Sequence, residues 1–98
     1  MTQQEINVER RAHPRYRVSK NGVFIDKTTG NSLYCKVVEM SAGGAKIRLA
    51  DAFVLSDRAE LVILSEALSY DVSVAWRAGN LIGLRFESDP KRVQMSYK

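Results

Sequence analysis

The sequence has little of the residue types from which most catalytic and metal sites are built. Its 98 residues include one cysteine, Cys35, and one histidine, His13, and only 8% are aromatic. A lone cysteine forms no disulfide within the chain, and one histidine leaves no cluster with metal-ligand spacing. Cys35 stands in the apolar alternation of residues 33–38 and is interpreted as a small core residue. We find no nucleophile paired with a base and no Walker-type phosphate loop, so we expect no enzyme, no metal and no cofactor.

Long apolar runs are also missing. No stretch approaches the roughly 18 residues that a membrane-spanning helix needs, and the N-terminus is polar rather than basic and then apolar. We therefore expect a cytoplasmic protein without a membrane span. A chain of 98 residues with 45% hydrophobic and 27% charged content is typical of one small globular domain with a modest core.

What the sequence does have is a concentration of positive charge near its N-terminus. The net charge is +4, and residues 9–20 alone account for it, because the rest of the chain has ten basic and ten acidic residues. A basic arm on an otherwise neutral domain indicates an anionic partner or a solvated tail. The cations of this segment are Arg10, Arg11, Arg15, Arg17 and Lys20.

Beyond the arm the periodicity is that of β-strands. Two pairs of apolar segments each flank a stretch rich in turn-forming residues, which predicts two β-hairpins. The first hairpin comprises residues 23–25, 26–31 and 32–39, and the second comprises residues 72–76, 77–80 and 81–86.

The remaining segments also favour an all-β domain. Residues 45–49 alternate apolar with cationic side chains, as a strand with one solvated face does, and residues 61–64 are apolar on both faces. Residues 50–59 have some helical character or form an irregular crossover. Asp89 and Pro90 initiate a turn, and residues 91–98 are expected to be a polar tail or a short helix. Several short strands predict a closed barrel, because closure leaves no unpaired edges.

Four segments together resemble a PilZ domain over residues 9 to about 90. They read Glu-Arg-Arg-Ala-His-Pro-Arg at 9–15, Val-Val-Glu-Met-Ser-Ala-Gly-Gly-Ala at 37–45, Val-Ala-Trp-Arg at 74–77 and Gly-Leu-Arg-Phe at 83–86. The family has an Arg-x-x-x-Arg motif, followed by a second motif of Asp or Asn, then x-Ser-x-x-Gly. In this chain the two motifs correspond to Arg11 and Arg15, preceded by Arg10, and to Glu39, Ser41 and Gly44.

The resemblance implies a six-stranded antiparallel β-barrel that binds the bacterial second messenger cyclic di-GMP and acts as a receptor. It suggests a division into a flexible basic arm at residues 1–17, a PilZ-like barrel at residues 18–90 and a C-terminal tail at residues 91–98.

The chemistry of the arginines agrees with that implication. Cyclic di-GMP carries two phosphates and two guanines, and a guanidinium group can bond bidentately to phosphate oxygens or to the O6 and N7 edge of guanine. It also stacks on purine rings, whereas lysine acts as a point charge. Arg10, Arg11 and Arg15 are therefore candidate ligand-binding residues, on an arm that we expect to be mobile before ligand arrives.

The second motif offers acceptors for the N1–H and N2 amino donors of guanine. Glu39 and Ser41 are two residues apart on a strand-like stretch, so we expect them on one face. Gly43 and Gly44 are expected to let the backbone turn with a positive φ or to let a base approach closely. A plain hairpin turn is the alternative for this segment.

Glu39 departs from the family's motif, and Trp76 allows two interpretations. Glu39 stands where the family has Asp or Asn, and its extra methylene changes the geometry of a bond worth roughly 1.5–3 kcal/mol. We expect binding that is weakened but survives. Trp76 is either a core or barrel-surface residue or flanks a guanine, and it joins the candidate ligand-binding residues.

The predicted mechanism is a ligand-ordered switch that changes the surface shown to a protein partner. Motility, pilus and exopolysaccharide machinery are the family's usual settings, and nothing in the sequence chooses among them. One alternative is a PilZ-like adaptor that has lost nucleotide binding, which Glu39 favours and the arginines oppose. A small basic barrel that binds single-stranded nucleic acid ranks third, because aromatic residues are few.

Overall fold

Seven β-strands make up the regular structure of the described part of the chain. A computed structural model describes residues 14–50 and 56–94. Within these ranges there is no helix, and hence none long and apolar enough to cross a membrane. The strands are β1 (Tyr16–Asp26), β2 (Ser32–Met40), β3 (Gly44–Arg48), β4 (Arg58–Ile63), β5 (Leu68–Ala78), β6 (Leu81–Phe86) and β7 (Lys91–Arg92).

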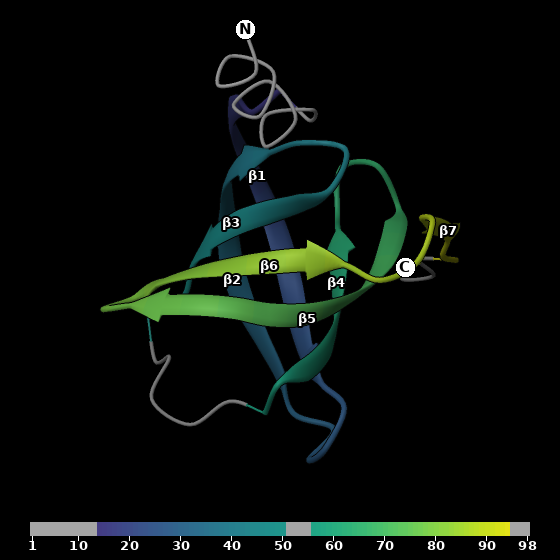
Figure 1. Ribbon diagram of the computed structural model, residues 1–98. Coiled ribbons are helices and arrows are strands. Elements are labelled where there is room, and N and C mark those ends of the chain that lie inside the picture. Colours follow the sequence, from purple (N-terminus) through teal and green to yellow (C-terminus); the bar gives the residue numbers. More distant parts are fainter. Residues whose placement is uncertain (1–13, 51–55, 95–98) are drawn as a thin grey trace, which may run out of the picture.

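The first six strands close into an antiparallel barrel (Figure 1). The strand order is β4-β1-β2-β3-β6-β5, and the additional pairing of β4 with β5 joins the two ends of that order. Closure confirms the predicted fold class, since it leaves the short strands with hydrogen-bonding neighbours on both sides.

Both predicted hairpins are present, and each turns at a glycine in the left-handed region. Gly30, between β1 and β2, has a φ of 81°, and Gly79, between β5 and β6, has a φ of 63°. A side chain would make this backbone conformation costly, so glycine is suited to both positions. The apolar segments that flank the turns pair in the predicted antiparallel manner.

The core lies inside the barrel and comes from alternating positions of every major strand. Its fully buried side chains include Phe24, Val37, Ile47, Leu61 and Ile82. Residues 61–63 are all buried, which confirms that this segment is apolar on both faces, while Leu64 belongs to the following turn. Cys35 is a core residue as predicted, and burial raises the pKa of its thiol to about 12.

The C-terminal segment adds a strand that the sequence does not predict. Lys91 and Arg92 form β7, which pairs with Ser69 and Leu68 at the start of β5, and the Val93 amide donates to the Ala67 carbonyl. β6 pairs only with the later part of β5, so β7 takes up backbone groups that would otherwise be unpaired. A two-residue pairing of this kind leaves no periodic signal in the sequence.

Two other expectations fall partly outside the described residues. Of the segment at 50–59, residues 51–55 are not described, while Arg58 and Ala59 begin β4. Of the arm at 1–17, residues 1–13 are not described, and β1 begins at Tyr16. The division of the chain at residues 17 and 90 stays a prediction.

Asp26 anchors the end of β1 to the segment that leads into β4. Its carboxylate accepts hydrogen bonds from the Ser56 hydroxyl at 2.7 Å and the Ser56 amide at 3.1 Å. It also accepts bonds from the amides of Thr28 at 2.8 Å and Thr29 at 3.3 Å. The Ser56 hydroxyl, followed by the Ser56 amide, is the main reason why the pKa of Asp26 is lowered to about 2. These bonds join the first hairpin to a part of the chain thirty residues away.

Candidate functional site

A row of cross-strand neighbours runs over the outside of the barrel. The registers place Glu39 of β2 opposite Lys46 of β3, Lys46 opposite Gly83 of β6, and Gly83 opposite Trp76 of β5. Ala45 and Ile47 on either side of Lys46 are buried in the core, so the Lys46 side chain points outward. The row brings together residues that are up to 44 positions apart in the sequence.

Two β-bulges decide that Glu39 and Trp76 face outward. In β2, the register passes from Val37 paired with Ile47 directly to Glu39 paired with Lys46. In β5, it passes from Val74 directly to Trp76. Strict alternation from the fully buried Val37 would turn Glu39 into the core, and one extra residue in the strand reverses that direction.

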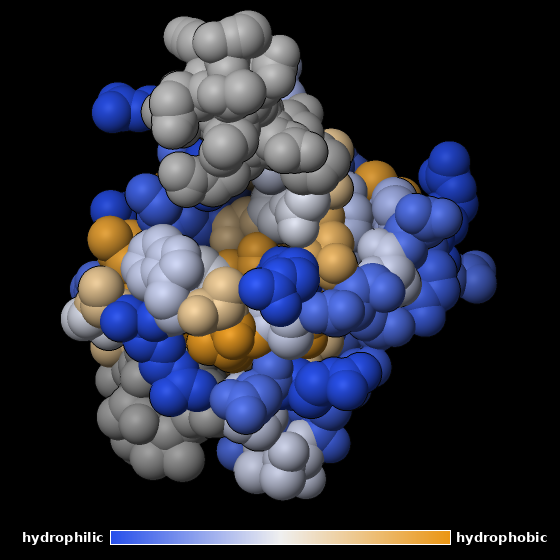
Figure 2. All heavy atoms as spheres, viewed as in Figure 1, coloured by the Kyte–Doolittle hydropathy of each residue, from blue (hydrophilic) through white to orange (hydrophobic). Residues whose placement is uncertain are grey.

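The row forms part of an open pocket of about 720 Å³. This volume lies within the range of roughly 300–1,000 Å³ that is usual for small-molecule sites. In the space-filling view, hydrophilic side chains frame an apolar area on the face formed by β3, β6 and β5 (Figure 2). The pocket is lined by Pro14, Arg15, Glu39, Met40, Ser41, Gly43, Gly44, Ala45, Lys46, Ala75, Trp76, Gly83 and Leu84.

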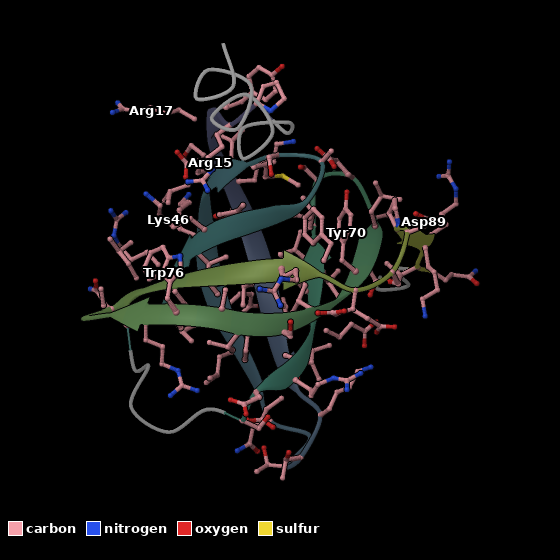
Figure 3. All side chains as sticks on the ribbon, in the orientation of Figure 1. Arg15, Arg17, Lys46, Tyr70, Trp76 and Asp89 are labelled. Atoms are coloured by element: carbon pink, nitrogen blue, oxygen red, sulfur yellow. The ribbon has the colours of Figure 1, made fainter. Side chains whose placement is uncertain are left out.

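The pocket therefore contains all the candidate ligand-binding residues that the structure describes. These are Arg15, Glu39, Ser41, Gly44 and Trp76, whereas Arg10 and Arg11 lie outside the described residues. Figure 3 shows Arg15 and Trp76 on the same side of the barrel, with Lys46 between them. That these residues share one pocket is a structural fact, and their roles in binding stay predictions.

Glu39 carries the negative charge of the pocket between two cations. Its Oε1 atom lies 3.6 Å from Lys46 Nζ and 3.9 Å from Arg15 Nη1. The Glu39 and Lys46 side chains are 25% and 32% exposed, while Arg15 is 73% exposed. Both distances are those of ion pairs without a direct hydrogen bond, so the carboxylate holds its partners loosely.

Ser41 shapes the turn that closes the β2–β3 hairpin. Its amide donates to the Gly44 carbonyl at 2.9 Å, and its hydroxyl oxygen accepts a hydrogen bond from the Gly43 amide at 3.2 Å. Ser41 also lines the pocket, and its hydroxyl oxygen retains a second lone pair, because a hydroxyl oxygen has two. The turn interpretation and the ligand-binding interpretation of this motif are therefore compatible.

Of the two alternatives expected for Gly43 and Gly44, the positive φ is wrong, because among the described residues the glycines with positive φ are Gly30 and Gly79. The close approach of a base stays a prediction, and the structure adds a further reason for glycine at position 44. A Cβ atom on Gly44 would lie 2.1 Å from the Leu84 carbonyl oxygen of the neighbouring strand. The close approach of β6 leaves no room for a side chain, and it positions the Ser41 turn against the barrel.

Trp76 lies over the backbone of Gly83. A Cβ atom on Gly83 would lie 2.1 Å from the indole Nε1 and 2.3 Å from Cε2 of Trp76, so the ring occupies that space. The Trp76 residue is nevertheless 44% exposed and lines the pocket. One side of the indole is thus supported by the sheet, while part of its surface is available for stacking.

Lys46 is a pocket residue that the sequence analysis did not single out. Its only signal was the alternation of apolar and cationic residues at 45–49, which predicts a solvated face. The fold places this face beside the outward face of β2. The two strands together carry the cations Lys36, Lys46 and Arg48 and the single acid Glu39. The chain outside residues 9–20 is neutral as a whole, but β2 and β3 together carry an excess of two positive charges.

Comparison with protein families agrees with this architecture. The model of the PilZ domain matches residues 9–96. The chain belongs to the PilZ domain family. PilZ domains are binding and adaptor domains that include receptors for cyclic di-GMP, and they are not enzymes. A comparison with curated proteins found no match. Within residues 14–50 and 56–94 no group of three His, Cys, Asp or Glu side chains is placed to hold a metal ion.

Proposed function

We propose that this PilZ domain is a cytoplasmic cyclic di-GMP receptor that signals to a protein partner. The observation that carries the proposal is the pocket, which gathers a guanidinium group, a carboxylate, a hydroxyl and an indole from three separate parts of the chain. They belong to Arg15, Glu39, Ser41 and Trp76. A purine nucleotide needs these chemistries together: cations for phosphate, acceptors for the guanine edge and a flat surface for the ring.

Each residue has a distinct part in the proposed complex. Arg15, together with Arg10 and Arg11, binds phosphate oxygens or guanine O6 and N7. Glu39 and Ser41 accept the N1–H and N2 donors of a guanine. Gly44 keeps this hairpin end close to β6, as the approach of the Leu84 carbonyl requires. Trp76 flanks a guanine from the β5 side.

The proposed output is a change of surface. Ligand that engages both the arm and the pocket holds the part of the arm before β1 against the barrel, and the partner senses the difference. The partner belongs to motility, pilus or exopolysaccharide machinery if the chain follows the usual settings of its family. Capture experiments with and without ligand would identify this partner.

One observation favours an adaptor that does not bind nucleotide as the second candidate. The Glu39 carboxylate already lies near Arg15 and Lys46. It therefore competes with a ligand phosphate for the same cations. If this competition prevails at cellular nucleotide concentrations, the domain acts through protein contacts alone.

Calorimetric titration with cyclic di-GMP tests the proposal, with GTP as the control ligand. We expect saturable binding that Arg15→Ala weakens by about ten- to a hundredfold, because a bond between charged groups is lost. Arg48→Ala is the matched control, since Arg48 is an exposed cation on β3 that does not line the pocket. We expect it to change the affinity by no more than about twofold.

Two results would overturn the receptor proposal. If cyclic di-GMP at high concentration produces no heat with the unmodified chain, the adaptor is favoured. Binding of a single-stranded oligonucleotide that falls steeply and linearly with the logarithm of salt concentration, without cyclic di-GMP binding, would favour the nucleic-acid barrel.

A further inference from the structure

Lys46 lines the pocket and is an inner member of the cross-strand row. It lies between Glu39 and Gly83 in the cross-strand row, and its neighbours Ala45 and Ile47 hold the strand by packing into the core. Its position is thus determined by the barrel itself, whereas Arg15 precedes the first strand. A cation that the sheet positions in this way can act as a preorganised anchor for an anion.

The two cations share one carboxylate oxygen. Lys46 Nζ and Arg15 Nη1 both approach Glu39 Oε1, at 3.6 Å and 3.9 Å, so two positive charges face one negative charge. Neither contact is short enough for a hydrogen bond. A phosphate group would supply additional negative charge and oxygens that accept short, charge-assisted hydrogen bonds from the same nitrogens.

We propose that Lys46 is a phosphate-binding residue of the pocket, and that Glu39 is the internal competitor that phosphate displaces from Lys46 and Arg15. The inference rests on the proposed function, because it assigns the cyclic di-GMP phosphate to this cation pair. The displaced carboxylate is then free to accept the guanine donors. Glu39 therefore sets the concentration at which the pocket fills: its attraction for the cations opposes phosphate entry, and its acceptor oxygens favour the base.

The chain provides a matched control for Lys46. Lys36 also points away from the core on the β2–β3 face and pairs across the strands with Arg48, but it does not line the pocket. Its Nζ atom donates to Asn21 Oδ1 at 3.0 Å. Lys36→Gln and Lys46→Gln remove the same charge from the same face, so a difference between them reports position rather than net charge.

Pyrophosphate is the appropriate first probe, because it carries phosphate oxygens and no base. We would titrate it into ¹⁵N-labelled protein and follow the backbone amides and the indole N–H of Trp76. We expect Lys46→Gln to lower the affinity about tenfold, as for the loss of one charged hydrogen bond, and Lys36→Gln to change it no more than twofold. Glu39→Gln should raise the affinity about threefold to fivefold, because it removes the competing charge of a partly exposed ion pair.

The results separate this inference from the proposed function. Equal affinities for Lys46→Gln and Lys36→Gln, or no pyrophosphate binding by any variant, would show that Lys46 is no phosphate site. An unchanged or lower affinity for Glu39→Gln would overturn its role as competitor. If the expected order appears with pyrophosphate but the unmodified chain does not bind cyclic di-GMP by calorimetry, the inference stands and the proposed function is wrong. Thermal unfolding of each variant verifies that it is folded.

Discussion

Asp26 and Glu39 are two partly or fully buried carboxylates that the fold uses in opposite ways. Asp26 lies at the end of β1, is 4% exposed and accepts four hydrogen bonds from fixed backbone and side-chain donors. Glu39 lies near the end of β2, and its side chain is 25% exposed beside two cations that it contacts only as loose ion pairs.

The difference lies in geometry and not in charge. The donors around Asp26 belong to the turn and to Ser56, so they cannot leave without unfolding part of the barrel. The cations around Glu39 contact it only at 3.6 Å and 3.9 Å, so a stronger anion can attract the ends of these side chains while the sheet holds the Lys46 backbone in place. One carboxylate therefore contributes to stability, while the other is the one that we propose a ligand phosphate displaces from its cations.

The two hairpin turns near these carboxylates allow the strongest test. Gly44→Ala places a Cβ atom 2.1 Å from the Leu84 carbonyl oxygen, so β3 and β6 must move apart. We expect the free energy of unfolding to fall by about 3 kcal/mol. Gly30→Ala meets nothing within 4 Å and suffers only from its φ of 81°, so we expect a loss of about 1 kcal/mol. Denaturant unfolding measures both, and equal losses would contradict the close packing at Gly44.

Asp26→Asn should destabilise the protein less than Gly44→Ala does, but by an amount that thermal unfolding can measure. The amide nitrogen of asparagine is a donor and replaces an oxygen that only accepts, so at least one of the four donors is left without a partner. We expect the midpoint of thermal unfolding at pH 7 to fall by several degrees.

The pH dependence of that difference provides a sharper check. The pKa of Asp26 is lowered from 3.8 to about 2 in the folded protein, so the unfolded chain takes up the proton more readily. The stabilisation by this carboxylate is fully present above pH 4 and is lost as the pH falls toward 2. The melting difference between the unmodified protein and Asp26→Asn should therefore shrink over this interval. A difference that stays constant would show that ionised Asp26 does not contribute in this way.

Glu39→Gln should have the smallest effect on stability. Its ion pairs are long and partly solvated, so we expect the free energy of unfolding to change by less than about 0.5 kcal/mol. Denaturant unfolding of this variant beside Asp26→Asn completes the comparison. A loss as large as that of Asp26→Asn would mean that Glu39 is a structural anchor as well.

The sequence was a good guide wherever neighbours along the chain determine the structure. The hairpin around residues 26–31 followed from its Gly and Asn residues, and the core position of Cys35 followed from apolar alternation. It was a poor guide where distant strands interact. Lys46 read as a solvated cation because the sequence does not show which strand lies beside β3, and Gly44 read as a turn residue because the approach of β6 is a tertiary contact.

The sequence by itself determined that the chain forms short strands and joins two pairs of them by tight turns. It also carries the arginine motif of a PilZ domain and the second motif with Glu39 in place of Asp or Asn. These properties follow from side-chain alternation and from backbone conformations that depend on adjacent residues. Only the tertiary structure decided that Glu39, Lys46, Gly83 and Trp76 form one row over the outside of the barrel. The bulges before Glu39 and Trp76 depend on the register with neighbouring strands, and that register is determined only when the barrel closes and the core packs.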